Sequence, residues 1–289
     1  MGKLIAIDMD GTLLNHENRI SDKNLNAIKQ AMASGIEIAI ATGRSHFDVQ
    51  EILKETTIKP WIIGANGATI HKPNGELFHS IPIDKQKAML ALKWLEKNEF
   101  YYEVSCNDSL FSHEKARELM SIEIDQVKTA NPDFDEAILH HAAARQYSQS
   151  GFAFISSLDE LLHDSIEIYS ILAFSFHENK RQKGWEYFYT HSDITLVTSG
   201  PHNFELEHLE ASKGNALEKL ANELNISIDE TIAMGDSMND LSMITKAGRG
   251  IAMGNAREEL KQASQEVTLT NNEDGVAHVI HQLVHSIKN

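Results

Sequence analysis

Short apolar runs alternate with helical segments at the start of the chain, and this pattern constrains the fold more than any other feature. Residues 4–7, 36–41 and 61–64 are apolar enough to be strands that are buried on both faces. Helical segments are predicted between them, over residues 22–34 and 47–54. Because strict alternation of strand and helix is typical of a parallel sheet with helices on both faces, the pattern predicts an α/β fold.

The same alternation returns near the end of the chain. A helix is predicted over residues 215–224, where leucine and alanine recur on one stripe, and a strand follows at 231–234. A helix at 241–246, a strand at 250–252 and a helix at 276–287 complete the pattern. The parallel sheet is therefore predicted to be assembled from both ends of the sequence.

The middle of the chain has a different character. A hairpin is predicted over residues 69–81, and a block richer in aromatic residues follows it. Strands and helices in this block do not alternate strictly, which favours an α+β arrangement. We therefore predict a discontinuous core domain, 1–83 and 197–289, and an inserted α+β domain, 84–196. The strands predicted in the insert are 100–104 and 168–176, and the helices are 85–97, 114–127, 135–147 and 179–189.

Composition restricts the class of partner. The 26 basic and 42 acidic side chains give a formal charge of −16, which argues against nucleic acid and anionic membranes as partners. The charge does not argue against a phosphorylated small molecule as substrate, because one metal ion and one lysine can make the electrostatic potential inside a pocket positive. The single cysteine, Cys106, cannot form an internal disulfide, and no apolar stretch is long enough to span a membrane. We expect a soluble, cytoplasmic protein.

Two carboxylates follow the first predicted strand. Asp8 and Asp10 are two residues apart, and Gly11 allows the backbone to approach a ligand closely. Ligands of open parallel sheets bind at the carboxyl ends of the strands, where one carboxylate can attack or hold metal while the other carries a proton. Taken alone, the segment could also be a solvated acidic turn.

Two further segments can bind an anion. Thr42 and Gly43 end the second predicted strand before Arg44 and a helix, and a hydroxyl with a glycine amide there makes an anion-binding turn. Lys213 immediately precedes another helix, where an ammonium group lies beside free backbone amides. The alternatives are an ordinary strand-to-helix turn with Thr42 as N-cap, and a surface lysine.

A second acidic segment follows the strand predicted at 231–234. Asp236, Asn239 and Asp240 offer carboxylate and amide oxygens at one strand end. Oxygen ligands of this kind suit a hard divalent ion, and Mg²⁺ is the ion we expect. The alternative is a helix N-cap provided by Asp236 or Ser237.

The four segments together resemble the haloacid dehalogenase (HAD) superfamily of phosphotransferases, and its Cof-type branch (subclass IIB) in particular. Residues 8–12 match Asp-x-Asp-Gly-Thr, Thr42 matches the strand-end hydroxyl, and Lys213 matches the motif lysine. Residues 235–240 match Gly-Asp-x-x-Asn-Asp, and 66–68, Asn-Gly-Ala, resemble a recurrent segment of the branch. The resemblance extends over the whole chain and implies a Rossmann-like core with an inserted cap domain.

The resemblance also implies a role for each matched residue. Asp8 would attack phosphorus and form an aspartyl phosphate, and Asp10 would act as acid and then as base. The groups expected to hold Mg²⁺ are the Asp8 carboxylate, the Asp10 backbone carbonyl and Asp236. The groups expected to bind the phosphoryl oxygens are Thr42, Lys213, Asn239 and the backbone amides of Met9 and Gly43. Asp240 is expected to support the site from behind these residues.

The implied activity is Mg²⁺-dependent hydrolysis of a phosphate monoester of a small metabolite, such as a sugar phosphate, a nucleotide or a flavin-precursor phosphate. The alternatives are a phosphomutase or other phosphotransferase of the superfamily, a receiver-like phosphorylated module, and a non-catalytic binding protein. The residues of the insert that would read the leaving group are not identified from the sequence. A monomer and a small homo-oligomer are both compatible with it.

Overall fold

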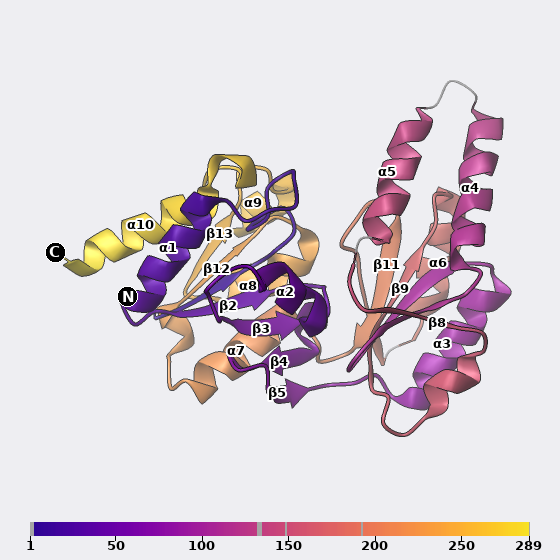
Figure 1. The fold of residues 1–289 in the computed structure, drawn as a ribbon, viewed down its shortest axis with the longest axis horizontal. Helices are drawn as coiled ribbons and strands as arrows, with labels where there is room; N and C mark the ends of the chain where they lie inside the picture. Colours follow the sequence, from indigo (N-terminus) through magenta and orange to yellow (C-terminus); the bar gives the residue numbers. More distant parts are fainter. Residues whose placement is uncertain (1–2, 132–134, 148, 192, 289) are drawn as a thin grey trace. The chain divides into compact units, whose positions relative to one another are not determined.

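The chain folds into two compact units. The computed structural model describes residues 3–131, 135–147, 149–191 and 193–288. One unit combines the two ends of the chain, Met1–Ser80 and Glu210–Asn289, and the other is the continuous segment Ile81–Leu209 (Figure 1). The core of the protein is therefore discontinuous in sequence. We call the first unit the core unit and the second the inserted unit.

The core unit is built on an eight-stranded sheet with the order β14-β13-β12-β1-β2-β3-β4-β5. The strands from β14 to β3 are parallel, and β4 and β5 extend the sheet in antiparallel fashion as the hairpin predicted from the sequence. The central strands are almost fully buried, as their apolar sequences require. Their bounds are β1 Leu4–Ile7, β2 Glu37–Ala41, β3 Trp61–Gly64, β4 Thr69–His71, β5 Leu77–Ser80, β12 Thr231–Gly235, β13 Arg249–Ala252 and β14 Glu266–Val267.

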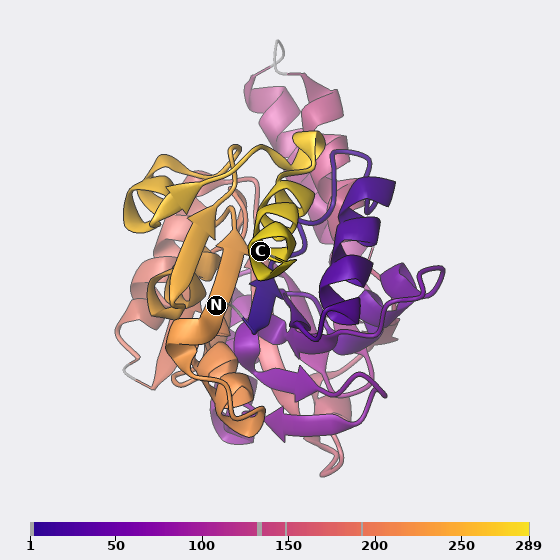
Figure 2. The same ribbon diagram turned by 90° about the vertical axis from the view of Figure 1, so that its left-hand side faces the viewer.

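Helices cover both faces of this sheet. The connections β1-α1-β2 and β12-α8-β13 run in opposite directions along the sheet, so right-handed crossovers put α1 and α8 on opposite faces. Figure 2 shows α10, in yellow, beside α1, in indigo, and these two helices are in contact. Helices α7 and α8 contact each other as a second pair. The bounds are α1 Asp22–Ala33, α2 His46–Leu53, α7 Lys213–Glu223, α8 Leu241–Lys246, α9 Glu258–Ala263 and α10 Gly275–Lys288.

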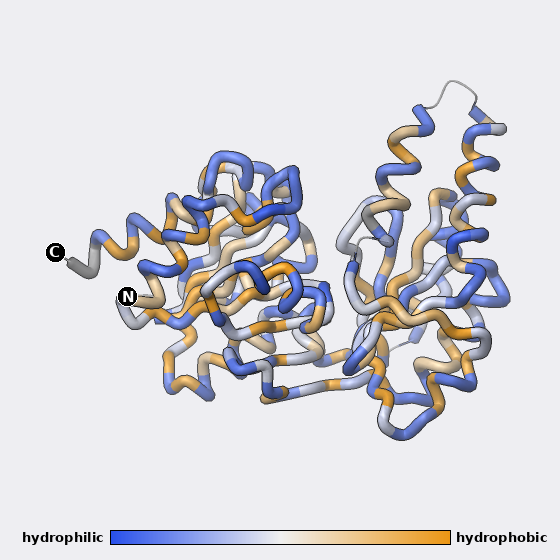
Figure 3. Tube along the Cα trace, viewed as in Figure 1, coloured by the Kyte–Doolittle hydropathy of each residue, from blue (hydrophilic) through white to orange (hydrophobic). Residues whose placement is uncertain are grey.

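The inserted unit has its own sheet and its own core. Its six strands have the order β10-β11-β9-β6-β7-β8 and are antiparallel except for the pair β7 and β8. Figure 3 shows hydrophobic stretches along the strands of each unit, which agrees with separate apolar clusters in the two units. The bounds are β6 Tyr101–Cys106, β7 Leu110–His113, β8 Phe152–Ile155, β9 Ile168–Phe174, β10 Ile194–Val197, β11 Asn203–His208, α3 Lys85–Lys97, α4 Ala116–Ala130, α5 Glu136–Gln146 and α6 Glu178–Tyr189.

The second boundary of the insert differs from the position expected from the sequence. We predicted that the core resumes at residue 197, but the compact units divide between Leu209 and Glu210. The reason is β11, which pairs with β9 and β10 and therefore belongs to the sheet of the inserted unit. The first boundary lies between Ser80 and Ile81, three residues before the predicted one.

Two smaller observations bear on function. Burial raises the pKa of Cys106 to about 12, so its thiol stays protonated and is a poor nucleophile at neutral pH. Among the helices that the structure describes, none has both the length and the apolar character needed to cross a bilayer.

Candidate active site

The sheet brings the predicted site residues together at its carboxyl edge. Strand β1 lies between β12 and β2, with Ile7 opposite Met234 on one side and Ile40 on the other. Asp8 follows directly after β1, and its backbone N–H donates to the carbonyl of Met234 at 2.9 Å. Parallel register therefore aligns the ends of three strands, and their polar residues meet because the strands end at the same level.

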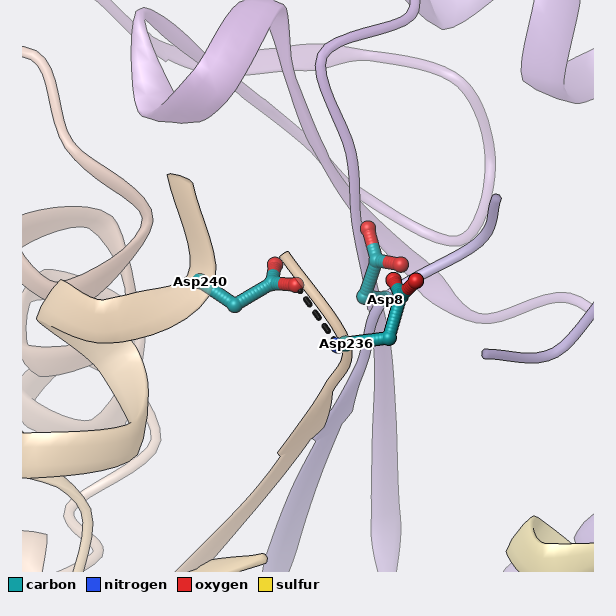
Figure 4. A group of neighbouring side chains, drawn as sticks. All are labelled: Asp8, Asp236 and Asp240. Carbon is teal, nitrogen blue, oxygen red and sulfur yellow. Dashed lines mark hydrogen bonds between the residues drawn. The ribbon is translucent and has the colours of Figure 1, made fainter. Parts of the chain in front are cut away.

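Three carboxylates form a cluster at this edge. One oxygen from each of Asp8, Asp236 and Asp240 lies within 4.8 Å of the others. Figure 4 shows the carboxylates of Asp8 and Asp236 next to each other at the ends of their strands, with Asp240 approaching from the turn before α8. Gly11 makes the close approach possible, since a Cβ there would lie 2.3 Å from Asp236 Oδ2 and its φ is +82°. The predicted metal-binding residues Asp8 and Asp236 are therefore neighbours.

Lys213 lies inside this cluster and is fully buried. Its Nζ donates to Asp8 Oδ1 at 2.7 Å and to Asp240 Oδ1 at 2.6 Å. Burial by itself lowers the pKa of a lysine, but the carboxylates of Asp240 and Asp8 outweigh it and raise the pKa of Lys213 above its ordinary value. The ammonium group is therefore a fixed positive charge next to the predicted nucleophile. It is not the surface lysine of the alternative interpretation.

Asp240 supports the turn as well as the lysine. Its Oδ2 accepts hydrogen bonds from the backbone N–H groups of Asp236 and Ser237, both at 2.9 Å. Its Oδ1 accepts from Lys213. Because both oxygens already bind donors, Asp240 orients the lysine and the Asp236 turn, and Asp8 and Asp236 are better placed to bind a cation.

The cluster is electrostatically unfavourable without a further cation. Burial is the main cause that raises the pKa of Asp8 well above its ordinary value, and repulsion from Asp240 adds to it. Burial and then the Asp240 charge raise the pKa of Asp236 to about 7. Ionisation of both Asp8 and Asp236 is therefore favoured only where a further positive charge lies close to them.

The Asp10 side chain is held by Arg44 at the edge of this cluster. Arg44 Nε donates to Asp10 Oδ2 at 2.7 Å and Nη2 donates to Asp10 Oδ1 at 2.8 Å, a bidentate pair. Arg44 Nη1 also donates to the buried Asp48, in the first turn of α2, at 2.5 Å. These contacts raise the pKa of Arg44, although burial acts in the opposite direction. Asp48 and Arg44 therefore fix the orientation of the Asp10 carboxylate.

The remaining predicted phosphate-binding residues lie around the same strand ends. Thr42 is buried, and its Oγ1 accepts from the Arg44 backbone N–H at 3.1 Å, which leaves its own hydrogen available to donate. Asn239 Nδ2 donates to Asn66 Oδ1 at 3.0 Å, and Asn239 Oδ1 is buried without a hydrogen-bond partner among the described residues. The Met9 side chain is packed in the core, so only its backbone is at the strand end.

The 66–68 segment contributes through a close backbone contact. A Cβ at Gly67 would lie 2.2 Å from the carbonyl oxygen of Ser212, and its φ is +101°. Only glycine allows the η1 turn, Ala65–Gly67, to pack against the start of α7 where Lys213 lies. This segment was recognised from the sequence by resemblance, and its packing role was not predicted.

Sequence reasoning did not assign roles to Arg44, Asp48 or Asn66. Arg44 was part of the recognised Thr42–Arg44 segment, and the spacing of Arg44 and Asp48 by four residues on a helix start was a signal for an ion pair. No local signal indicates the Asn66–Asn239 pair, because its members are 173 positions apart.

Comparison with known proteins identifies the family of this chain. The family model described as haloacid dehalogenase-like hydrolase matches residues 5–280. Phosphatase YwpJ of Bacillus subtilis (strain 168) is 50% identical over 284 residues, covering 98% of this chain and 100% of the relative. The 5-amino-6-(5-phospho-D-ribitylamino)uracil phosphatase YwtE of the same organism is 39% identical and covers 98% of both chains.

A solved structure is also similar. A haloacid dehalogenase-like hydrolase from B. subtilis superposes with a TM-score of 0.86 at 50% identity, covering 97% of this chain and 99% of the other. With the α/β sheet and the family model matching nearly the whole length, this chain belongs to the haloacid dehalogenase-like hydrolases.

Proposed function

We propose that this protein is a Mg²⁺-dependent phosphatase that hydrolyses a phosphate monoester of a small metabolite through an aspartyl phosphate on Asp8. The observation that carries the proposal is the buried Lys213 ammonium 2.7 Å from the Asp8 carboxylate, beside the neighbouring Asp236. A dianionic phosphate can approach a carboxylate nucleophile only where cations offset the repulsion. Relatives that match the whole chain are named phosphatases, which supports the same reaction class.

The donor set fits a hard divalent cation. Carboxylate oxygens gather where one ammonium leaves negative charge uncompensated, and oxygen ligands are those that Mg²⁺ prefers. The Asp8 and Asp236 carboxylates and the Asp10 backbone carbonyl would hold the ion. When bound, it would neutralise negative charge on the phosphoryl oxygens and the nucleophile.

Asp8 and Asp10 would divide the chemistry. An oxygen of Asp8 attacks phosphorus, the bond to the leaving oxygen breaks, and Asp10 gives that oxygen a proton. Asp10 then takes a proton from the water that hydrolyses the aspartyl phosphate. Because both Asp10 oxygens accept from Arg44 here, protonation of Asp10 would weaken this charge-assisted pair.

The other core residues would bind the phosphoryl group. Lys213 supplies a fixed charge, the Thr42 hydroxyl keeps a free hydrogen, and the backbone amides of Met9 and Gly43 are expected to donate at the strand ends. Asn239 has one amide hydrogen committed to Asn66 and a second that can donate. Donors in this number suit the three oxygens of a phosphoryl group.

The inserted unit would act as a cap that selects the substrate. The segment Ile81–Leu209 contains none of the predicted catalytic residues, so its sequence can vary between relatives without changing the chemistry. Two relatives are named phosphatases of 5-amino-6-(5-phospho-D-ribitylamino)uracil. We include this flavin-precursor phosphate, sugar phosphates and nucleotides in the candidate class. The proposal keeps the expected cytoplasmic location and leaves both a monomer and a small homo-oligomer open.

The direct test is hydrolysis of p-nitrophenyl phosphate with Mg²⁺, followed by a panel of metabolite phosphates ranked by kcat/KM. Release of inorganic phosphate identifies a phosphatase, whereas transfer to a sugar hydroxyl identifies a phosphomutase. Asp8→Asn keeps the size of the side chain and should lose turnover by about three orders of magnitude or more. Activity of that variant within about tenfold of the unaltered protein would refute Asp8 as nucleophile.

A further inference from the structure

A short segment after β13 connects the two parts of the chain that carry the acidic cluster. The Met253 backbone N–H donates to the carbonyl of Gly235 at 2.9 Å, and the Arg257 N–H donates to the carbonyl of Asp236 at 3.1 Å. Between them, Asn255 Nδ2 donates to the carbonyl of Gly11 at 2.8 Å. Residues 253–257 therefore bind both the Asp236 turn and the loop that follows Asp8.

Both ends of the Asn255 side chain are engaged. While Nδ2 binds the Gly11 carbonyl, Oδ1 accepts from the Asn271 backbone N–H at 2.9 Å. One partner is an acceptor and the other a donor, so this position requires a side chain with one donor and one acceptor. An aspartate of the same size can satisfy Asn271 but would place a carboxylate oxygen against the Gly11 carbonyl.

The Gly11 peptide lies against the cluster itself. A Cβ on Gly11 would be 2.3 Å from Asp236 Oδ2, and Thr12 Oγ1 donates to Asp236 Oδ1 at 3.4 Å. The neighbouring carbonyl, that of Asp10, is one of the three groups expected to hold the metal. Rotation of the Gly11 peptide would therefore move the Asp10 carbonyl and change the contact with Asp236.

We propose that Asn255 is a positioning residue, which sets the distance between the loop at residues 10–12 and Asp236 by fixing the Gly11 carbonyl. This inference rests on the proposed function and adds a residue outside the recognised segments. Asn255 is solvent-exposed, so its hydrogen bonds contribute little to stability, and their effect lies in geometry. Loss of one such hydrogen bond should cost about three- to tenfold in kcat.

The test uses two variants and a matched control in the full chain. Asn255→Asp removes the donor to Gly11 while keeping the acceptor for Asn271, and Asn255→Ala removes both. The control is Asn272→Ala, another exposed asparagine, whose Oδ1 accepts from the His16 N–H at 2.9 Å farther along the same loop. Each protein is titrated with Mg²⁺ alone by thermal shift and assayed with p-nitrophenyl phosphate.

Both Asn255 variants should lower kcat about three- to tenfold with KM within about twofold, and should raise the half-saturating Mg²⁺ concentration in the thermal shift by a similar factor. Their melting temperatures in EDTA should stay within about 2 °C of that of the unaltered protein. Asn272→Ala should have the same kcat, Mg²⁺ response and melting temperature as the unaltered protein.

Asn255 variants whose Mg²⁺ response equals that of Asn272→Ala would overturn the proposal. So would a lower melting temperature in EDTA with an unchanged Mg²⁺ response. If the unaltered protein hydrolyses no phosphate ester, the proposed function fails, and the Mg²⁺ titration still decides the positioning role.

Discussion

Asp236→Asn should stabilise the metal-free protein while removing its response to Mg²⁺. Burial and the nearby Asp240 raise the pKa of Asp236 from about 3.8 to about 7. Between these values the folded state binds more protons than the unfolded state, so the stability of the metal-free protein falls as pH rises. A shift of about three units corresponds to about 4 kcal/mol at pH 8, which partial solvent exposure reduces to about 2 kcal/mol. Asparagine carries no charge and avoids this cost.

The assay is thermal unfolding in EDTA at pH 5 and pH 8, and then with Mg²⁺. At pH 8 the variant should melt higher by about 4–8 °C. At pH 5 the gain should be roughly a third as large, because only the part of the shift below that pH contributes. Saturating Mg²⁺ should stabilise the unaltered protein by about 3 kcal/mol at a hundred times its Kd and leave the variant almost unchanged. The matched control, Asp229→Asn, replaces an exposed carboxylate and should change neither result.

Two outcomes would refute the reasoning. One is a variant that is less stable than the unaltered protein in EDTA at pH 8, which would mean that Asp236 makes favourable contacts that exceed the repulsion. The other is a gain of the same size at pH 5 and pH 8, which would mean that the effect comes from packing and has no electrostatic origin.

Three further predictions concern the surroundings of the cluster. Arg44→Lys should lower kcat about tenfold or more, because lysine cannot bind both oxygens of Asp10 in the same plane; an unchanged kcat with p-nitrophenyl phosphate would contradict this. Burial lowers the pKa of His71 to about 4, so stability should fall as pH decreases from about 6.5 towards 4. At pH 5, urea unfolding should show that His71→Gln recovers about 1 kcal/mol of the lost free energy of unfolding. The control His285→Gln, at an exposed histidine, should recover none of it. Gly67→Ala should destabilise the core unit by about 2 kcal/mol or more, because its Cβ would lie 2.2 Å from the carbonyl oxygen just before α7; an unchanged melting temperature would contradict the contact.

The core sheet could be predicted because buried parallel strands have an unambiguous sequence pattern. Strands β1 and β3 have the predicted bounds, and helix α8 begins and ends where expected. Helix α1 begins at Asp22 as predicted, and Ser21 accepts from the Asn24 backbone N–H as its N-cap. In these segments local preference and burial agree, so periodicity alone identifies the element.

The strands of the inserted unit were harder to predict. Strand β11, Asn203–His208, carries Glu205 and Glu207, and both glutamates are buried. A buried glutamate depends on partners elsewhere, such as the Ser199 hydroxyl that donates to Glu205. Because such partners cannot be inferred from a short polar segment, the sequence suggested no strand there, and the predicted boundary at 196 and 197 fell too early.

The candidate site, like the fold, could be predicted only in part. The strand-end rule anticipated that Asp8 and Asp236 would be neighbours, because it depends only on strand order. Lys213, which precedes a helix, was assigned to the same site by the family resemblance. The direction of each side chain depends on contacts across the sheet, and the rule carries no information about those. The pairing of Asp10 with Arg44, and of Asp240 with two backbone amides, therefore required the structure.

Protons and a bound metal ion would compete for the same cluster, and this follows from its charges. Lys213 binds Asp8 and Asp240, the Asp236 carboxylate lies beside them, and Asp10 is already paired with Arg44. Burial, and then repulsion from Asp240, raises the pKa values of Asp8 and Asp236, so the metal-free cluster tends to hold protons on these two residues. A divalent cation bound there would favour the ionised forms of Asp8 and Asp236, and its binding would release those protons. The Asp240 carboxylate accepts from the Asp236 and Ser237 backbone N–H groups, and the Asp8 N–H donates to the Met234 carbonyl, so backbone hydrogen bonds hold the residues of the cluster in place.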